Sequence, residues 1–394
     1  MSFDKNPRDP VIVAAVRSAI GKGKRGTLKD TRPDTLLAAV LKAAVEKCSG
    51  LDPAAIDDVI VGNATPEAEQ GLNLARNAAI LAGLPNSVPA VTVNRFCSSG
   101  VQAIAHGAEK ILAGWADVVL AGGVESMSLI PMGGYHPMPN PQLMEERPDV
   151  YAPMGLTAEI VAERYGVTRE EQDAFSLDSH NKALKAQAED RFQDEITPVE
   201  VTVWTDEGPR EVLFNKDEGP RDGSTLEGLA KLKTPFKVGG SVTAASSSQV
   251  SDGAAAVMVM AREKAEALGL ESLGVLRMYQ VVGVAPDEMG VGPLYAIPAA
   301  LEKAGMSKDD IDIYEINEAF ASQALYCIRE LGIDTSKVNP NGGAIALGHP
   351  LGCTGARMTA TLLHEMDKQD AKYGVVSMCI GGGMGAAAIY ERES

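Results

Sequence analysis

The chain has 394 residues, of which 45% are hydrophobic and only 5% aromatic, and its formal net charge is −17. This length is enough for two or three core-sized units, and the acidic balance argues against nucleic acid as the main partner, because phosphate binding needs a basic surface. Five cysteines without close pairs exclude a disulfide framework and favour a reducing compartment.

The chain begins with the polar segment MSFDKNPRDP. No apolar run further along approaches the roughly 20 residues that are needed to cross a bilayer. We therefore expect a cytoplasmic protein that is neither secreted nor inserted into a membrane.

The first part of the chain alternates between strand-like and helix-like segments. The pattern predicts these elements: a strand at 11–16, a helix near 33–48, strands at 57–62 and 90–93, a helix at 98–113 and a strand at 117–122. Such alternation is typical of a layered α/β unit.

Cys97, in the motif NRFCSSG, stands where the second of these helices begins. Apolar residues recur at helical spacing after it, so its sulfur is expected at the positive end of a helix dipole. That position lowers the pKa of a thiol, and a nearby imidazole would lower it further. The sequence therefore predicts a reactive cysteine.

Residues 125–250 differ in composition and in predicted structure from the segment before them. Prolines are frequent between 131 and 141, a capping box runs from Thr168 to Glu171, and long loops follow. The end of the segment gathers basic residues that could meet phosphates, although a solvated basic face is an equally good account of this stretch alone: Arg221, Lys231, Lys233 and Lys237. We interpret 125–250 as an inserted domain that forms a lid.

The second half of the chain repeats the first. Shifted by about 255 residues, GLDPAAIDDVIVG at 50–62 falls on GMSKDDIDIYEIN at 305–317, and CSSG at 97–100 falls near GCTG at 352–355. The repeat predicts two pseudo-symmetric halves, with the segment GGAIALGHP as an addition in the second. The resulting division is an N-terminal half at 1–124 and 251–270, the insert at 125–250, and a C-terminal half at 271–394.

Two further residues of the second half lie in glycine-rich frames. His349 stands between Gly348 and Pro350, in a loop too rich in glycine for an ordinary buried element, and we expect an exposed general base there. Cys379 ends an apolar strand and runs into bare glycines, whose backbone amides can face a ligand. Together with Cys97, these residues indicate thiol chemistry.

The remaining cysteines and histidines fit ordinary packing. Cys48, Cys327 and Cys353 fall on apolar helical faces. The other histidines are expected on helices or in a proline-rich loop, without a catalytic role: His106, His136, His180 and His364.

The motifs NRFCSSGVQAI, GGVESM, SSQVSDGAA, EINEAFA, GGAIALGHPLGCTGAR and CIGGGMG together resemble the thiolase family, and the similarity extends over essentially the whole chain. In wording it is most similar to degradative 3-ketoacyl-CoA thiolases. The resemblance implies an α/β thiolase fold, with two duplicated halves in a five-layer αβαβα arrangement. It also implies a loop domain that covers coenzyme A, and assembly as a homodimer or homotetramer, with a β-oxidation complex as a further candidate partner.

The resemblance also implies roles for five residues. Cys97 would be the nucleophile, His349 its base, and Cys379 the acid and base for the acetyl-CoA enolate and for incoming coenzyme A. Asn317 of the NEAF motif would hold a water that forms an oxyanion hole with His349, and the amides of Cys97 and Gly381 would form a second. The implied reaction is ping-pong acyl transfer, with coenzyme A as a substrate and with no metal or redox cofactor.

For the coenzyme, the resemblance points to Arg221, Ser248 and Met154. Ala245 and Ser246 stand where many relatives carry Gly-Asn, which bears on the geometry of this loop. Pro153 stands where short-chain enzymes often carry histidine, which favours longer 3-ketoacyl substrates.

Alternative functions stay open at this point. They are an acetoacetyl-CoA thiolase working in condensation, a decarboxylating ketosynthase, which generally has histidine in place of the second cysteine, and a silent subunit that only binds coenzyme A.

Overall fold

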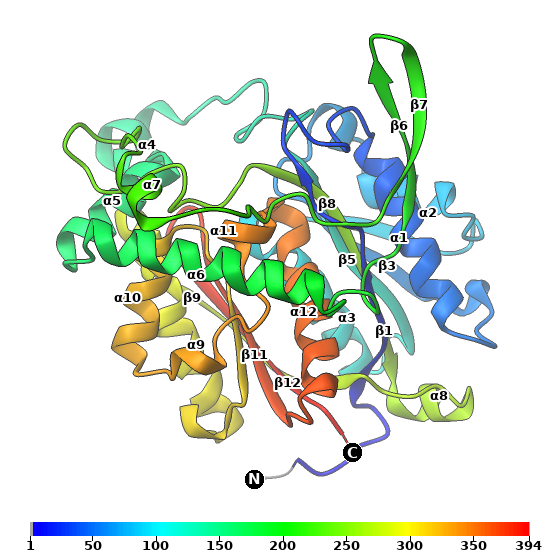
Figure 1. The fold of residues 1–394 in the computed structure, drawn as a ribbon. Coiled ribbons are helices and arrows are strands. Elements are labelled where there is room, and N and C mark those ends of the chain that lie inside the picture. The colour runs from blue at the N-terminus through cyan, green and yellow to red at the C-terminus, as the bar shows by residue number, and fades with distance from the viewer. Residues whose placement is uncertain (1–2, 394) are drawn as a thin grey trace.

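The computed structural model describes residues 3–393, and a ten-stranded sheet runs through it (Figure 1). The strand order is β10-β11-β12-β9-β1-β8-β5-β3-β4, with β2 paired to β8. The first half of the chain supplies β1 (Pro10–Arg17), β2 (Gly21–Lys22), β3 (Asp58–Gly62), β4 (Ala90–Val93), β5 (Val118–Ser126) and β8 (Ser251–Ala261). The second half supplies β9 (Gly274–Gly283), β10 (Ile313–Ile316), β11 (Tyr373–Ile380) and β12 (Met384–Glu391).

The two sets of strands meet at a narrow seam. Strands β1 and β9 pair antiparallel through Val11 with Val275 and Ile12 with Gly274. The seam lies in the middle of the sheet, so each half keeps a sheet of its own on either side of it.

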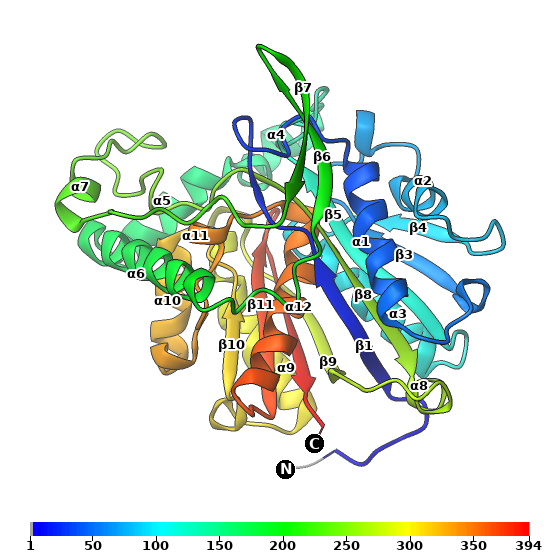
Figure 2. The same ribbon diagram turned by 45° about the vertical axis from the view of Figure 1, so that its right-hand side comes forward.

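Helices cover the sheet in layers (Figure 2). Helices α1 (Pro33–Lys47) and α2 (Leu74–Leu81) pack on the outer face of the first half. Helices α3 (Ser99–Leu112) and α12 (Leu351–Lys368) pack on each other and share one apolar core with strands of both halves. Helices α9 (Gly292–Ala304) and α10 (Ala321–Leu331) cover the outer face of the second half. The predicted five-layer α/β arrangement is confirmed.

The side-chain alternation of β1 explains how one strand serves two cores. Val11 and Val13 point to the outer core and Ile12 to the central core, and a register shift between Ile12 and Ala14 interrupts the alternation, so that Ala15 also points to the central core. A strand buried on both faces in this way has no polar face, which agrees with its uninterrupted apolar sequence. The predicted elements of the first half agree with the observed bounds to within about two residues, except that β5 extends further, to Ser126.

The segment predicted as an insert folds into α4 (Pro141–Glu146), α5 (Met154–Arg164), α6 (Arg169–Ala188), a hairpin of β6 (Val199–Thr205) and β7 (Gly208–Phe214), and α7 (Leu226–Ala230). Helix α6 begins with the predicted capping box, in which Thr168 and Glu171 bond each other's backbone. The hairpin projects from the body in Figure 1. The division of the chain at 124, 250 and 270 stays a prediction.

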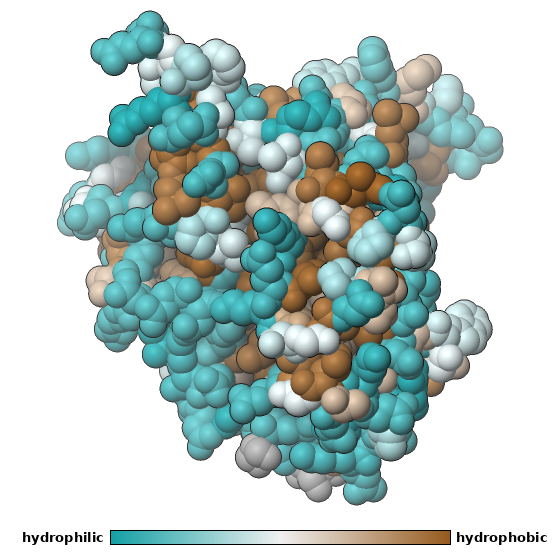
Figure 3. All heavy atoms as spheres, turned by 90° about the vertical axis from the view of Figure 1, so that its right-hand side faces the viewer, coloured by the Kyte–Doolittle hydropathy of each residue, from teal (hydrophilic) through white to brown (hydrophobic). Residues whose placement is uncertain are grey.

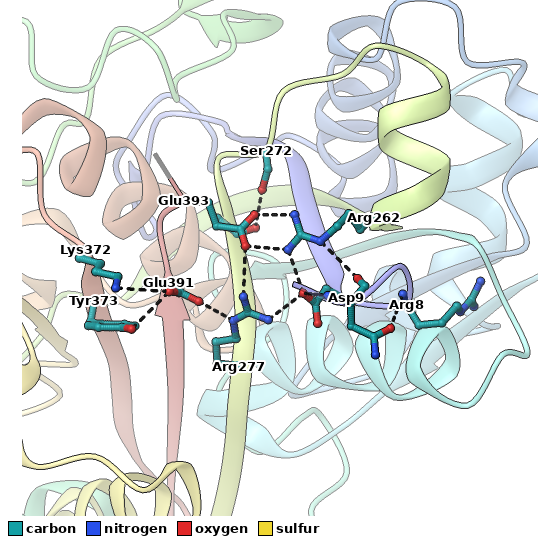
Figure 4. A network of polar contacts seen from close by, with 11 residues as sticks. Arg8, Asp9, Arg262, Ser272, Arg277, Lys372, Tyr373, Glu391 and Glu393 are labelled. Carbon is teal, nitrogen blue, oxygen red and sulfur yellow. Dashed lines mark hydrogen bonds and ion pairs between the residues drawn. The ribbon is translucent and has the colours of Figure 1, made fainter. Parts of the chain in front are cut away.

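Charged side chains join the two chain ends across the seam, and Figure 4 shows these contacts. Arg277 of β9 pairs with Asp9 at 2.9 Å, with Glu391 at 2.7 Å and with Glu393 at 3.1 Å. Arg262, the first residue of α8 (Arg262–Ala267), pairs with Asp9 at 2.8 Å and Glu393 at 2.6 Å. We call these five residues the terminal network.

Within residues 3–393, no helix is long and apolar enough to cross a membrane. The same residues contain no group of three or more histidine, cysteine or acidic side chains arranged to hold a metal ion.

Candidate active site

Cys97 lies in a single 3-10 turn (Phe96–Ser98) that leads directly into α3. Phe96 has a φ of +44°, a conformation that costs a bulky residue of the order of 1–3 kcal/mol and often marks a functional site. The turn is held locally, because the Phe96 N–H donates to Asn94 Oδ1 at 2.8 Å and the Arg95 N–H to Ser99 Oγ at 2.8 Å. The sequence thus places the cysteine at a strained helix entry.

The predicted low pKa of Cys97 is wrong. Burial raises the pKa of this thiol to about 11, against smaller lowering contributions from the N–H groups of Gly381 and of Cys97 itself. The side chain is 7% exposed and packs against Ala64, Met127 and Leu351. At neutral pH the sulfur is therefore protonated, and a base must take its proton when it attacks.

His349 is buried, at 4% exposure, so the expectation of an exposed base is also wrong. The backbone N–H of His349 donates to the backbone carbonyl of Gln249 at 3.2 Å. The preceding Gly348 has a φ of +104°, and a Cβ there would lie 2.2 Å from Ser251 Oγ. The glycine therefore allows the loop to lie close against other segments, which cover the imidazole.

The hydrogen bonds around His349 define its tautomer. Thr354 Oγ1 donates to the Pro350 carbonyl at 2.9 Å and lies 2.6 Å from His349 Nδ1, so Nδ1 carries a proton and donates to the threonine. Burial, with the nearby Arg357 charge, lowers the pKa of His349 to about 3. The ring is therefore neutral, and its Nε2 carries the lone pair that can accept a hydrogen bond.

Asn317 follows β10 and faces that lone pair. Its Nδ2 lies 3.3 Å from His349 Nε2, and its Oδ1 is buried without a hydrogen-bond partner. The next residue, Glu318, fixes the loop that carries the histidine by accepting from Ile345 N–H at 3.1 Å and Asn339 Nδ2 at 2.9 Å. The orphaned amide oxygen suits a water molecule at this point.

Cys379 is the last residue but one of β11 and is fully buried. Burial raises the pKa of its thiol well above the ordinary value, and the neighbouring Cys97 adds to the rise. Beyond it, the Gly381 N–H is directed at the Cys97 sulfur, and Gly382 and Gly383 have φ of +82° and +88°. The turn thus brings a backbone donor and a second sulfur to the nucleophile.

The segments that carry Cys97 and His349 approach each other at the first residues of α12. Leu351 packs against Cys97, and Gly352 N–H donates to Glu125 Oε2 at 2.8 Å, while the Glu125 charge also acts on Cys97. The structure therefore brings Cys97, Cys379 and Gly381 together and places Asn317 against His349, which stands two residues before the Leu351 that packs on Cys97. Thr354 and Glu125 were missed in the sequence, although the position of Thr354 in the first turn of the helix after His349 is a usable signal.

The residues predicted to contact the coenzyme lie on three different segments and differ in burial. Met154 is near the centre, since a Cβ on Gly381 would lie 3.7 Å from its Sδ. Ser248 is half-buried, and its N–H donates to the Ala319 carbonyl beside Asn317 at 2.9 Å. Arg221 is exposed, and its N–H donates to His180 Nδ1 at 3.2 Å.

The loop in which Ala245 and Ser246 depart from many relatives is well bonded. The N–H groups of both residues donate to Thr243 Oγ1, at 3.2 and 3.1 Å. The Ser246 carbonyl accepts from Ala321 N–H at 2.8 Å. Among the basic residues, Lys237 pairs with Glu163, whereas Lys231 and Lys233 are exposed.

Comparison with known proteins gives one consistent result. Residues 10–263 match the family described as "Thiolase, N-terminal domain", and residues 270–392 match "Thiolase, C-terminal domain". A 3-ketoacyl-CoA thiolase of Bacillus subtilis is 56% identical over 389 residues, which cover 98% of this chain and 99% of that protein. The peroxisomal 3-ketoacyl-CoA thiolase B of Mus musculus is 55% identical and covers 97% of this chain and 91% of its own. The solved dimeric peroxisomal thiolase of Saccharomyces cerevisiae is similar with a TM-score of 0.91 and 46% identity, covering 99% of each chain.

Proposed function

The chain belongs to the thiolase family, and on that premise we propose that it is an acyltransferase that cleaves 3-oxoacyl-CoA with coenzyme A. The products are acetyl-CoA and an acyl-CoA shortened by two carbons. The observation that carries the proposal is the group of two buried sulfurs and the Gly381 amide, with the neutral imidazole of His349 two residues before Leu351, which packs on Cys97. This reaction belongs to fatty-acid degradation.

In the first half-reaction, the Cys97 sulfur attacks the 3-keto carbon while its proton passes to His349 Nε2. The new Nε2–H, together with a water held by Asn317, stabilises one developing oxyanion. The bond between carbons 2 and 3 then breaks, the shortened acyl group stays on Cys97, and the acetyl-CoA enolate takes the proton of Cys379.

In the second half-reaction, the Cys379 thiolate takes the proton of incoming coenzyme A. The coenzyme thiolate attacks the acyl group on Cys97, whose carbonyl oxygen receives the N–H groups of Cys97 and Gly381. Cys97 leaves as a thiolate and regains its proton from His349. The proton of Cys97 returns to it by way of His349, whereas Cys379 gives its own proton to acetyl-CoA and is reprotonated by coenzyme A.

The covalent intermediate is the direct test. Incubation with an acyl-CoA, without added thiol, should add one acyl mass to Cys97, as determined by peptide mass spectrometry. Cys97→Ala should abolish both the adduct and turnover, while the buried Cys48 should stay unmodified in both proteins. A folded wild-type protein whose Cys97 gains no acyl mass would overturn the proposal.

For the substrate, we propose a preference for longer 3-oxoacyl chains. Pro153 precedes Met154 where a histidine would indicate a short-chain enzyme, and Cys379 lies in an apolar cluster with Phe320 and Met289. Thiolysis rates for 3-oxoacyl-CoA from four carbons upward test this. A strict preference for acetoacetyl-CoA would favour the alternative, an acetyl-CoA acetyltransferase working in condensation.

For coenzyme A, we propose that Arg221 contacts the nucleotide end, and that Ser248 and Met154 line the path to the sulfurs. The exposure of Arg221 and the closeness of Met154 to Gly381 support this order. Arg221→Ala should raise the KM for coenzyme A with little change in kcat.

We further propose that the protein forms a homodimer, since the similar yeast thiolase is described as dimeric. Strand β4 is an outermost strand of the sheet, Val91 on it is 40% exposed, and Leu72 beside it is 93% exposed. Figure 3 shows this side of the molecule, where hydrophobic surface gathers in several patches. Light scattering should give twice the chain mass, and Leu72→Glu should weaken the dimer. Four times the chain mass would indicate a tetramer. Membership of a β-oxidation complex would require that a partner protein is captured together with this one.

For localisation, we propose the cytoplasm. Five cysteines without close pairs favour a reducing compartment, whereas the mouse relative is named peroxisomal. Fractionation of cells that express the protein decides between the two compartments.

A further inference from the structure

A pair of buried charged residues lies behind the histidine, and the proposed reaction does not use it. Glu315 is on β10, two residues before Asn317, so both side chains project from the same face of the strand. Arg357 is on α12, three residues after Thr354, so both lie on the same helix face. Asn317 and His349 therefore meet just beyond the strand and just before the helix, and Glu315 and Arg357 face each other between the two elements.

The second of these contacts is loose. Arg357 Nη1 lies 3.9 Å from Glu315 Oε2, beyond hydrogen-bond distance, and both side chains are 1% exposed. Glu315 Oε1 and the Nε and Nη1 atoms of Arg357 are buried without a hydrogen-bond partner. Such groups are costly, so their presence in a native core calls for an explanation.

The chain can satisfy a buried guanidinium when only stability is needed. Arg17 is equally buried, yet its Nε donates to Glu195 at 2.6 Å, and its Nη1 and Nη2 donate to Asp217 at 2.7 and 2.9 Å. Arg357 has no such bidentate partner. The loose pairing leaves much of its positive charge uncompensated near the active site.

That charge acts on the catalytic base. Burial is the larger cause of the lowered pKa of His349, and the positive charge of Arg357 lowers it further. Burial in turn raises the pKa of Glu315 to about 8, against a lowering contribution from Arg357. The other titratable groups that face this pair come from several elements: Arg17 on β1, Glu195 after α6, Glu318 after β10, and Cys353 and Glu365 on α12.

We propose that Glu315 and Arg357 are positioning residues that set how readily His349 accepts the proton of Cys97. Arg357 keeps the imidazole neutral and its Nε2 available, and Glu315, which is largely protonated at neutral pH, leaves that positive charge uncompensated. This inference rests on the proposed role of His349 as the base for Cys97.

The test is the pH dependence of Cys97 alkylation by iodoacetamide, followed by peptide mass spectrometry, with kcat and KM for thiolysis measured in parallel. Arg357→Met removes the positive charge, so the acid limb of the profile should move up by about one pH unit. Arg357→Lys keeps the charge and, since no bidentate contact is lost, should keep the wild-type limb. Glu315→Gln keeps this side chain neutral, as the protonated carboxyl is at pH 7, and should leave kcat, KM and the acid limb near their wild-type values.

A purely structural role would give a different result. An unmoved acid limb in Arg357→Met, or an equal shift in Arg357→Lys, would overturn the proposal. If Arg357→Met does not fold, as judged by circular dichroism, Glu315→Gln is compared with the double variant Glu315→Gln/Arg357→Met, in which the limb should again move up. Absence of thiolysis in the wild type would refute the proposed function instead. The two failures can be told apart, because the alkylation profile can be measured without turnover.

Discussion

The two ends of the strands in the second half of the sheet differ in how charged and polar groups are paired. Near the chain ends, the terminal network pairs Arg262 and Arg277 with three carboxylates at 2.6 to 3.1 Å. Near the ends of β10 and β11, Asn317 Oδ1 and several atoms of Glu315 and Arg357 are buried without partners, and the cysteines and His349 are neutral.

The same strand links the two regions. Strand β11 begins at Tyr373, whose hydroxyl donates to Glu391 of the terminal network at 3.2 Å, and its last residues include Cys379. The two regions therefore differ in role. The terminal network stabilises the contact between the halves, whereas the ends of β10 and β11 keep polar groups available to a ligand. Substitutions at the two ends should therefore affect different properties.

The largest effect is expected at Cys379. Cys379→Ala removes the acid that protonates the enolate, so thiolysis should fall about 10³-fold while Cys97 can still be acylated by a reactive thioester. Rates and the acyl mass on Cys97 give the two readouts. Cys327→Ala is the matched control, since this cysteine is equally buried and donates to the Gly290 carbonyl at 3.6 Å. Unchanged turnover in Cys379→Ala would contradict its role as acid and base.

At the other end, Arg277→Met should affect stability rather than chemistry. Three carboxylates lose a partner that is 6% exposed, and breaking a buried pair in this way costs about 3 kcal/mol. Urea denaturation measures the loss, and kcat per folded molecule should stay the same. Arg147→Met, which breaks only an exposed pair with Asp149, should cost far less. Equal losses in the two variants would remove the special status of the terminal network.

Thr354→Val returns to the catalytic end with a smaller expected effect. The variant removes the acceptor of the His349 Nδ1 proton at 2.6 Å, so the tautomer with a free Nε2 is no longer favoured. We expect kcat to fall about tenfold with KM unchanged. Thr359→Val, which removes a hydroxyl from the same helix near Tyr390, should leave kcat near the wild-type value.

Local patterns in the sequence predicted the elements and the residues of the centre. The periodicity after Cys97, the capping box at Thr168 and the apolar strand before Cys379 all depend on neighbours along the chain, and the structure confirms them. The repeat between the halves also predicted that distant motifs would meet.

The state of those residues could not be read from local pattern. Glycines around His349 indicated a free backbone, but its burial depends on Gln249 and Ser251 from another part of the chain. The start of α3 predicted a low pKa for Cys97, but burial raises the pKa, and burial is a property of the whole fold. The pair of Glu315 and Arg357 escaped notice because its members are 42 positions apart in the sequence.

The smallest effect, in the terminal network, concerns acid. Although burial acts to raise it, the hydrogen bonds from Arg262, from the Asn6 N–H and from Arg277 lower the pKa of Asp9 from its ordinary 3.8. A carboxylate with a lowered pKa in the folded state stabilises the protein above its ordinary pKa, and this contribution is lost as the pH falls through the lowered value. Asp9→Asn should therefore cost about 1 kcal/mol at pH 7, and the difference from the wild type should shrink below about pH 4. Urea titrations at pH 7, 5 and 3.5 measure this convergence, with the exposed Asp149→Asn as control. A difference that stays constant across these pH values would mean that the charge of Asp9 does not contribute to the join.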